Sequence, residues 1–179
     1  MQTAVDTNLL IVLLRGKPQE QAQLVAEALI EYDRQGRLII CPAVWSELRV
    51  LISEKKLNSF LKDNRIAVDW ELPPEVWSSA AEAFAHYLQN RRQSGSLYYC
   101  SACGKEMNVR CPQCGKIQGF PRHILPDFLI SAHALRRANL FLTADTGIPR
   151  RYFGELKVLN PLDKPKEQVA GESQADKKA

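Results

Sequence analysis

The sequence predicts an α/β fold in which helices cover both faces of a parallel sheet. Short apolar runs typical of buried strands alternate with longer segments whose apolar residues recur at helical spacing. The 179 residues, 45% hydrophobic and 25% charged, have the composition of an ordinary globular domain. No apolar run reaches the roughly 18 residues that a membrane span needs. A signal peptide carries basic residues before its apolar run, whereas the N-terminal apolar run of this sequence has none. We therefore expect a cytoplasmic protein.

The elements can be assigned in order from apolar spacing and from the residues that start and stop helices. Prolines lie where helices begin, and a glycine lies where one of them ends. Strands are expected at residues 3–6, 38–41, 66–68, 140–143 and 157–159. Helices are expected at 8–14, 18–36, 42–52, 57–61, 73–92 and 126–138. The segment 163–179 is rich in Lys, Glu, Gln and Ser and is expected to be disordered.

Four of the five cysteines form two pairs, Cys100 with Cys103 and Cys111 with Cys114, and a glycine follows each pair. This spacing is typical of a metal site with four thiolate ligands. Two disulfides are the alternative, which a reducing cytoplasm disfavours. Zinc is the expected metal, with rubredoxin-like iron as the alternative. Four thiolates leave no position for water, so the site should be structural, whereas Cys41 ends an apolar run and should be a core residue.

The cysteine module interrupts the α/β pattern between two helices, which indicates an insertion. We therefore expect the α/β domain to consist of residues 1–94 and 123–162. The zinc-ribbon-like module would comprise residues 95–122, and the tail residues 163–179.

Basic residues concentrate around this module. Residues 91–151 contain ten Lys or Arg and three Asp or Glu, a net of +7 in a chain whose total is +4. Such a region favours a polyanionic partner, although a solvated basic face is the alternative. We expect His133 to be exposed among arginines. The candidate phosphate contacts are Arg91, Arg92, Lys105, Arg110, Lys116 and Arg122.

Acidic residues lie where parallel strands end. Asp6 ends the first expected strand, and Asp145 lies two residues beyond the fourth. Glu47 borders the apolar stripe of its helix, and Asp127 lies in the first turn of another. Each has a simple explanation as a cap, a turn residue or a surface partner. If all four met at the carboxyl edge of the sheet, they would repel unless a divalent cation such as Mg²⁺ or Mn²⁺ neutralised them.

Four segments resemble, in order and spacing, the acidic motifs of PIN-domain nucleases, closest to VapC-type toxin ribonucleases. They are Val5–Asn8, Ser46–Leu48, Pro126–Ala132 and Leu142–Asp145. The resemblance covers about residues 1–162 apart from the insertion. It implies a PIN-like α/β/α sandwich with sheet order 3-2-1-4-5 and RNA cleavage dependent on Mg²⁺ or Mn²⁺. The implied metal-binding acids are Asp6, Glu47, Asp127 and Asp145, with Asn8 and Thr143 in support.

The resemblance also implies a homodimer and an antitoxin protein as partners. The sequence departs from the family after Asp145, where Thr146-Gly147-Ile148-Pro149 precedes Tyr152 and Phe153. The departure leaves open whether one or two catalytic metals bind. Two other functions stay open: a housekeeping RNA-processing nuclease, and a non-catalytic module that binds RNA or protein.

Overall fold

A five-stranded parallel sheet forms the centre of the fold. The structure is a computed structural model that describes residues 1–94, 98–99, 106–107, 110–116 and 125–163. The strands of the sheet are β1 (Gln2–Val5), β2 (Arg37–Ile40), β3 (Ile66–Val68), β6 (Leu140–Leu142) and β7 (Val158–Leu159). Their order is β3-β2-β1-β6-β7, with every neighbouring pair parallel, which confirms the expected order 3-2-1-4-5.

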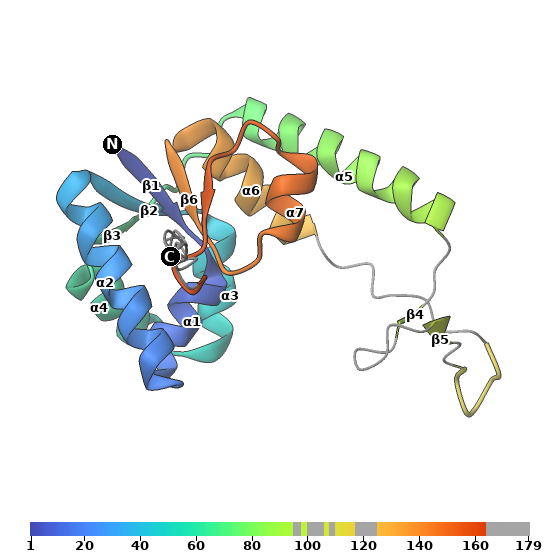
Figure 1. Ribbon diagram of the computed structural model, residues 1–179, viewed down its shortest axis with the longest axis horizontal. Coiled ribbons are helices and arrows are strands. Elements are labelled where there is room, and N and C mark those ends of the chain that lie inside the picture. The colour runs from blue at the N-terminus through green and yellow to red at the C-terminus, as the bar shows by residue number, and fades with distance from the viewer. Residues whose placement is uncertain (95–97, 100–105, 108–109, 117–124, 164–179) are drawn as a thin grey trace, which may run out of the picture.

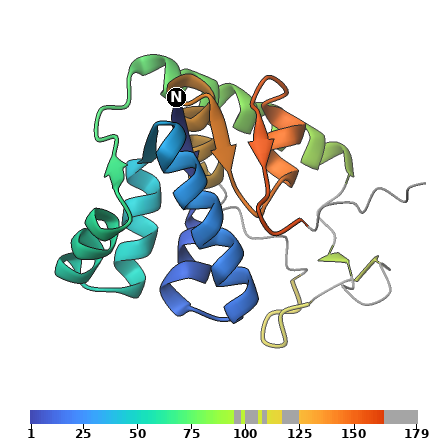
Figure 2. The same cartoon turned by 60° about the vertical axis from the view of Figure 1, so that its left-hand side comes forward.

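Helices pack on both faces of this sheet. They are α1 (Thr7–Arg15), α2 (Gln19–Gln35), α3 (Pro42–Leu51), α4 (Glu54–Asp63), α5 (Pro74–Ser94), α6 (Leu125–Arg137) and α7 (Gly147–Tyr152). On one side, α1 and α2 lie together, whereas α6 packs against β1 and β6 on the other, with α5 outside it (Figures 1 and 2). The expected α/β class is therefore confirmed.

The register of the central strands determines which residues meet at the carboxyl edge of the sheet. Val5, the last residue of β1, is the partner of Leu142, the last residue of β6. Asp6 continues this alignment, because its amide donates to the Leu142 carbonyl at 3.0 Å. Thr143 follows Leu142 and donates its own amide to Leu159 at 3.1 Å. The ends of β1 and β6 thus bring Asp6 and Thr143 side by side.

Helix α7 is not among the helices expected from the sequence. Pro149 lies in the first turn, where helix amides have no carbonyl partner, so its missing N–H costs nothing there. The proline is also buried. The structure therefore adds a short helix that begins two residues after Asp145.

A cluster of aromatic rings holds α5, α6 and α7 together. Phe128 of α6 is fully buried at its centre. Its ring centroid lies 5.4 Å from that of Phe84 and 5.5 Å from that of Tyr87, both on α5. It also lies 5.4 Å from the centroid of Tyr152 and 6.2 Å from that of Phe153. Because Phe128 follows Asp127, this packing also positions the first turn of α6.

The expectation that His133 is exposed is wrong. Its side chain is 1% exposed, and its Nε2 lies 3.2 Å from Oδ2 of Asp69. Arg137 donates to the same carboxylate through Nε at 2.8 Å. Burial lowers the pKa of His133, while the bonds from Arg137 hold the pKa of Asp69 below its usual value. The sequence misled because α6 is enclosed on most of its surface, and Asp69, 64 residues away, supplies the polar partner.

The expected insertion is described only in part. Strands β4 (Tyr98–Tyr99) and β5 (Glu106–Met107) pair antiparallel. Residues 110–116 are also described, whereas Cys100 and Cys103 lie outside the described residues, as does the expected disordered tail from residue 164. In the described part of the chain, no helix combines the length and hydrophobicity needed to cross a bilayer.

The Asp69 network yields a stability prediction. Replacing Asp69 with Ala would leave the buried His133 ring without its partner, which should lower the free energy of unfolding by about 1–3 kcal/mol. The matched control is Asp33→Ala, which removes a bridge to Arg65, a side chain that is 78% exposed. The control should lose less than about 1 kcal/mol. Equal losses in urea unfolding would contradict the structural role of Asp69.

Candidate active site

Four acidic residues from separate elements approach one another at the carboxyl edge of β1 and β6. Asp6 caps the N-terminus of α1, Glu47 lies on α3, Asp127 lies in the first turn of α6, and Asp145 precedes α7. Asp6, Glu47 and Asp127 are partly buried, whereas Asp145 is exposed. Asp6, Asp127 and Asp145 line one small cavity, and Glu47 is bonded to Thr7 next to Asp6, so the structure brings these predicted residues together.

Polar contacts hold the Asp6 carboxylate in place. Its Oδ1 accepts from the Thr7 amide at 2.7 Å. Its Oδ2 accepts from Nδ2 of Asn8 at 2.7 Å and from the Thr143 hydroxyl at 2.5 Å. The side-chain amide of Asn8 also donates to Thr143 Oγ1 at 3.0 Å, and its oxygen accepts from the Ala144 amide at 3.0 Å. Asn8 and Thr143 therefore connect the ends of β1 and β6 and orient Asp6.

Thr143 also orients the segment that carries Asp145. Its hydroxyl oxygen accepts from the Asp145 amide at 3.0 Å. The carboxylate of Asp145 in turn accepts from the Gly147 amide at 2.9 Å, at the start of α7. One buried hydroxyl thus contacts both the Asp6 side chain and the Asp145 backbone.

Sequence reasoning missed two residues of this region, Thr7 and Ser131. Thr7 is buried, and its hydroxyl donates a short hydrogen bond to Oε2 of Glu47, which connects α1 to α3. Ser131 lies one helical turn after Asp127 and is 2% exposed. Its spacing of four residues from Asp127 was the available signal, because such residues share a helix face. Thr7 carried no comparable signal, since its partner lies 40 residues away.

Burial and like charge together perturb two of the acids. Burial is the main cause that raises the pKa of Asp6 to about 6, and the charges of Glu47 and Asp145 add to it. The bonds from Thr143 and Thr7 oppose this shift. The pKa of Asp127 is also raised to about 6, first by burial and then by the charges of Asp6, Glu47 and Asp145. These carboxylates therefore resist ionisation until a positive charge compensates them.

A small cavity lies between three of the acids. Asp6, Asp127, Asp145 and Ser131 contribute to its lining, and its volume is about 10 Å³. This is roughly the space that one water molecule requires. Carboxylate and hydroxyl oxygens are hard ligands of the kind that Mg²⁺ and Mn²⁺ prefer. Within the described residues, however, no three His, Cys, Asp or Glu side chains are placed to hold a metal ion without rearrangement.

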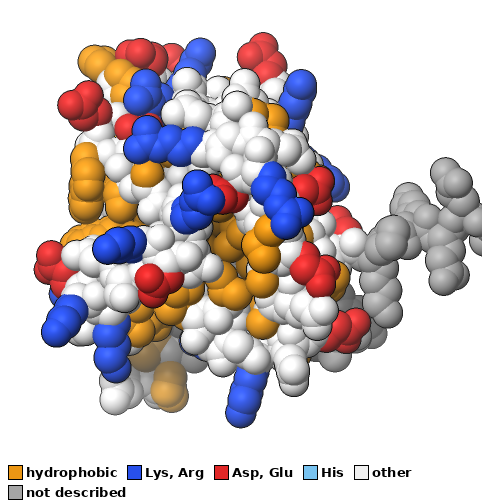
Figure 3. All heavy atoms as spheres, turned by 90° about the vertical axis from the view of Figure 1, so that its left-hand side faces the viewer, with side chains coloured by type: hydrophobic (Ala, Val, Ile, Leu, Met, Phe, Trp, Pro, Cys, Tyr) orange, Lys and Arg blue, Asp and Glu red, His pale blue; other side chains and the backbone are white. Residues whose placement is uncertain are grey.

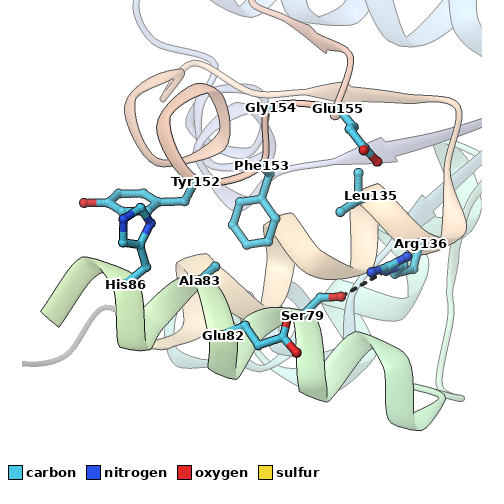
Figure 4. A pocket seen from close by; sticks show the side chains of 10 residues that line it. All are labelled: Ser79, Glu82, Ala83, His86, Leu135, Arg136, Tyr152, Phe153, Gly154 and Glu155. Atoms are coloured by element: carbon cyan, nitrogen blue, oxygen red, sulfur yellow. Dashed lines mark hydrogen bonds between the residues drawn. The ribbon is translucent and has the colours of Figure 1, made fainter. Parts of the chain in front are cut away.

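A larger depression of about 380 Å³ lies between α5, α6 and α7, and it contains none of the four acids. Figure 4 shows Arg136 pointing toward Ser79, to which its Nε donates at 2.9 Å, with Glu82 and Glu155 on the rim. Its charged groups are of both signs and do not converge on one point. The depression therefore offers no reactive group comparable to the acidic cluster.

The second cysteine pair forms a tight loop. The Gly115 amide donates to the Cys111 carbonyl at 2.9 Å, and Gly115 has a φ of +67°, which explains the glycine at this position. Backbone amides of Cys114 and Gln113 donate to the Cys111 sulfur and lower the pKa of its thiol. By contrast, burial raises the pKa of the core thiol Cys41 to about 11.

The predicted phosphate contacts are described unevenly. Arg110 and Lys116 are exposed, and the Arg110 guanidinium donates to the Gly115 carbonyl at 3.2 Å. Arg91 and Arg92 lie in α5, but their side chains are outside the described part, as are Lys105 and Arg122. On the face shown in Figure 3, Lys and Arg are interspersed with Asp and Glu, so no single-sign patch covers that side.

Comparisons with known proteins identify the fold. No protein-family model and no curated protein matches this sequence. A chain of VapBC2 from Rickettsia felis, whose structure includes a DNA fragment from the promoter, is similar with a TM-score of 0.56 at 16% identity. That match covers 89% of this chain and 98% of the other.

A chain of VapBC-1 from nontypeable Haemophilus influenzae gives a TM-score of 0.52 at 16% identity, and the match covers 91% of this chain and 100% of that one. Together with the strand order, these likenesses show an α/β fold like that of the PIN domains of VapC proteins.

Proposed function

We propose that this chain is a ribonuclease of the PIN type that requires Mg²⁺ or Mn²⁺. The observation that supports it most directly is the convergence of Asp6, Glu47, Asp127 and Asp145, carried by four elements, on the carboxyl edge of β1 and β6. Ligands of open parallel sheets bind at this edge. The resemblance of the four motifs and the PIN-like fold both point to phosphodiester hydrolysis there.

The four acids would hold the metal, and Ser131 would contribute a hydroxyl at the cavity between them. A bound divalent cation would supply a nucleophilic water and neutralise charge on the scissile phosphate. Asn8 and Thr143 would keep the Asp6 carboxylate in one orientation through the bonds that they already donate to it. The expected products carry 5′-phosphate and 3′-hydroxyl ends.

The proposal includes a toxin role with a small antitoxin partner and a homodimeric state. What supports the antitoxin is the fold shared with chains of VapBC complexes. A housekeeping RNA-processing nuclease would use the same site without an antitoxin. Growth arrest on expression, relieved by a small protein encoded beside this chain, would distinguish the toxin from the housekeeping enzyme.

A non-catalytic module that binds RNA or protein is the second candidate. The observation that favours it is that the described carboxylates require rearrangement before three of them could share an ion. The bonds that Asp6 accepts from Thr7, Asn8 and Thr143 would have to be partly exchanged for metal contacts.

We further propose that residues 95–122 form a structural zinc module between the two parts of the PIN domain, 1–94 and 123–162, with Cys100, Cys103, Cys111 and Cys114 as ligands. What supports it is the loop at Cys111, where amides of two later residues donate to the sulfur. Such bonds stabilise a thiolate, which is the form that binds zinc. The basic residues around the module would contact the RNA backbone.

Cleavage of RNA tests the catalytic proposal. The purified protein should cleave labelled single-stranded RNA with Mn²⁺ and not with EDTA. Asp6→Asn should reduce the rate by at least about 100-fold, because the replaced oxygen loses the charge that holds the cation. Gel analysis of product lengths and ends measures this. Equal cleavage by the variant would indicate a contaminating nuclease. The catalytic proposal would then be rejected in favour of the non-catalytic binding module.

The raised pKa values lead to a pH-dependent stability prediction. For an acid whose pKa rises from 3.8 to about 6 on folding, the stabilising contribution is present below the unfolded value and is lost as the pH rises through about 6. Without metal, Asp6→Asn should therefore be more stable than the wild type at pH 7.5, and the difference should shrink toward pH 5.

With Mn²⁺ at pH 7.5, the wild type should become more stable than Asp6→Asn, because Mn²⁺ binds the ionised cluster of the folded state only. Thermal unfolding at pH 5, 6 and 7.5, with and without Mn²⁺, measures both effects. Comparing the two proteins at each pH cancels the contribution of His133, which destabilises both as it gains a proton. A pH-independent difference would contradict the raised pKa of Asp6.

The zinc module is tested by metal content. Elemental analysis should find about one zinc per chain in the wild type and none after Cys100→Ser with Cys103→Ser, because two thiolates do not complete the site. Cys41→Ala is the matched control, since this cysteine is buried in the core, and it should retain the zinc. Unchanged zinc in the double variant would refute the assignment, and iron in its place would revise the metal.

A further inference from the structure

Two exposed tryptophans border an apolar pocket that the proposed chemistry does not explain. The residues Trp70 and Trp77 are 61% and 55% exposed. With Leu72, Leu129 and the first turn of α3 they line a pocket of about 440 Å³, which we call the tryptophan pocket. Large exposed aromatic residues around an apolar depression mark a binding surface.

Both indole rings are held in place. The Trp77 Nε1 donates to the Leu72 carbonyl at 3.2 Å, which fixes the ring at the start of α5. Trp70 packs edge-to-face on Trp45, with ring centroids 5.3 Å apart. A ring that is already oriented loses little conformational entropy when a ligand stacks on it. The exposed faces are therefore suited to a planar ligand.

The tryptophan pocket lies on the same edge of the sheet as the acidic cluster. The first turn of α3 follows the carboxyl end of β2, and Trp70 lies two residues after β3. The acids Asp6 and Asp145 follow β1 and β6, and the strand order places β2 directly beside β1. A ligand that extends along this edge would therefore contact both places.

Helix α3 connects the two places. Ala43, which lines the tryptophan pocket, lies four residues before Glu47 and so on the same face of the helix. Glu47 in turn accepts a hydrogen bond from the hydroxyl of Thr7, the residue that follows Asp6. One turn of α3 thus separates the pocket from the acidic cluster.

The charges near the tryptophans are of both signs. Asp69, which precedes Trp70, is bonded to Arg137 at 2.8 Å and to His133 at 3.2 Å. Arg49 lies over the ring of Trp45, with its guanidinium carbon 5.8 Å from the ring centroid. Asp69 is thus compensated, whereas Glu71, which follows Trp70, and Glu75 are exposed acids, so the indole faces and not the local charge would attract a base.

We propose that the tryptophan pocket binds an unpaired nucleobase of single-stranded RNA whose backbone lies at the acidic cluster. Every base has a flat aromatic face that stacks on an indole, so the site selects unpaired RNA and tolerates different sequences. A duplex keeps its bases stacked on one another and cannot supply one. This inference rests on the proposed function, since it names the substrate class of that site.

Binding of a fluorescein-labelled RNA octamer in EDTA tests the inference without cleavage. Trp70→Ala and Trp77→Ala should each weaken the affinity by about 5- to 150-fold, which is the usual effect of removing a base-stacking side chain. Trp70→Phe and Trp77→Phe should retain most of the affinity because the aromatic face remains. Ile30→Ala, at a 54% exposed apolar residue of α2, is the matched control and should bind as the wild type does.

An octamer with abasic sites but the same backbone separates stacking from phosphate contacts. It should bind the wild type and both alanine variants with equal affinity. The wild-type protein provides a test without substitutions, because the intact octamer should quench its tryptophan fluorescence and shield it from iodide. Unchanged fluorescence, or alanine variants that bind the intact octamer as tightly as the wild type does, would overturn the inference.

Light scattering addresses the competing occupant, a second copy of this chain. A wild type that dimerises and alanine variants that are monomeric, with equal RNA affinity, would assign the pocket to self-association and refute base binding. The EDTA assay also separates the two proposals. Stacking can be found when no cleavage occurs, and cleavage that depends on Asp6 but not on the tryptophans would refute this inference alone.

Discussion

The partial burial of the Asp6 carboxylate between the ends of β1 and β6 is the constraint on which the site depends. Removing a carboxylate from water is costly unless polar groups replace the lost hydration. Here the Thr7 amide, the Asn8 side chain and the Thr143 hydroxyl replace it. Two of these groups belong to the first residues of α1, and the third follows β6, so they meet only because Val5 is in register with Leu142. The strand pairing therefore determines the chemistry at the edge of the sheet.

The same arrangement explains why the site needs a stable surrounding. Four acids at one edge raise the free energy of the folded state through burial and mutual repulsion. Packing away from the acids holds α6, which carries Asp127, and α7, which Asp145 precedes. Phe128 anchors the first turn of α6 in the aromatic cluster, and the same cluster contacts Tyr152 at the end of α7. Apolar packing behind the acids thus offsets the electrostatic cost in front of them.

The strands and long helices were predictable from the sequence because each has a local cause. Apolar runs produced β1, β2 and β6, and proline and glycine limited the helices. Three of the four acids were predictable from local pattern, because Asp6 and Asp145 follow strands and Asp127 begins a helix, whereas Glu47 lies within α3 at the margin of its apolar stripe. The contacts that these and other polar residues make were not predictable. Thr7 meets Glu47, and His133 meets Asp69, across 40 and 64 residues, and no local pattern carries such pairings. The tryptophan pocket was missed for the same reason, since it combines residues of α3, α5 and α6.

The carboxyl edge of the sheet carries acids of two kinds, and the difference between them indicates their roles. Asp69 after β3 is paired with Arg137 and His133, and its pKa is lowered, as expected of a charge that stabilises the fold. Asp6 and Asp127 have raised pKa values, and in the described part of the chain no Lys, Arg or His forms a salt bridge with either. Asp69 has basic side chains as partners, whereas Asp6 and Asp127 have none in the described part of the chain. A bound cation would compensate the charge of these two acids. This contrast supports the proposed cation at the ends of β1 and β6, whereas the proposed base site beside β2 and β3 rests on the oriented and exposed tryptophans.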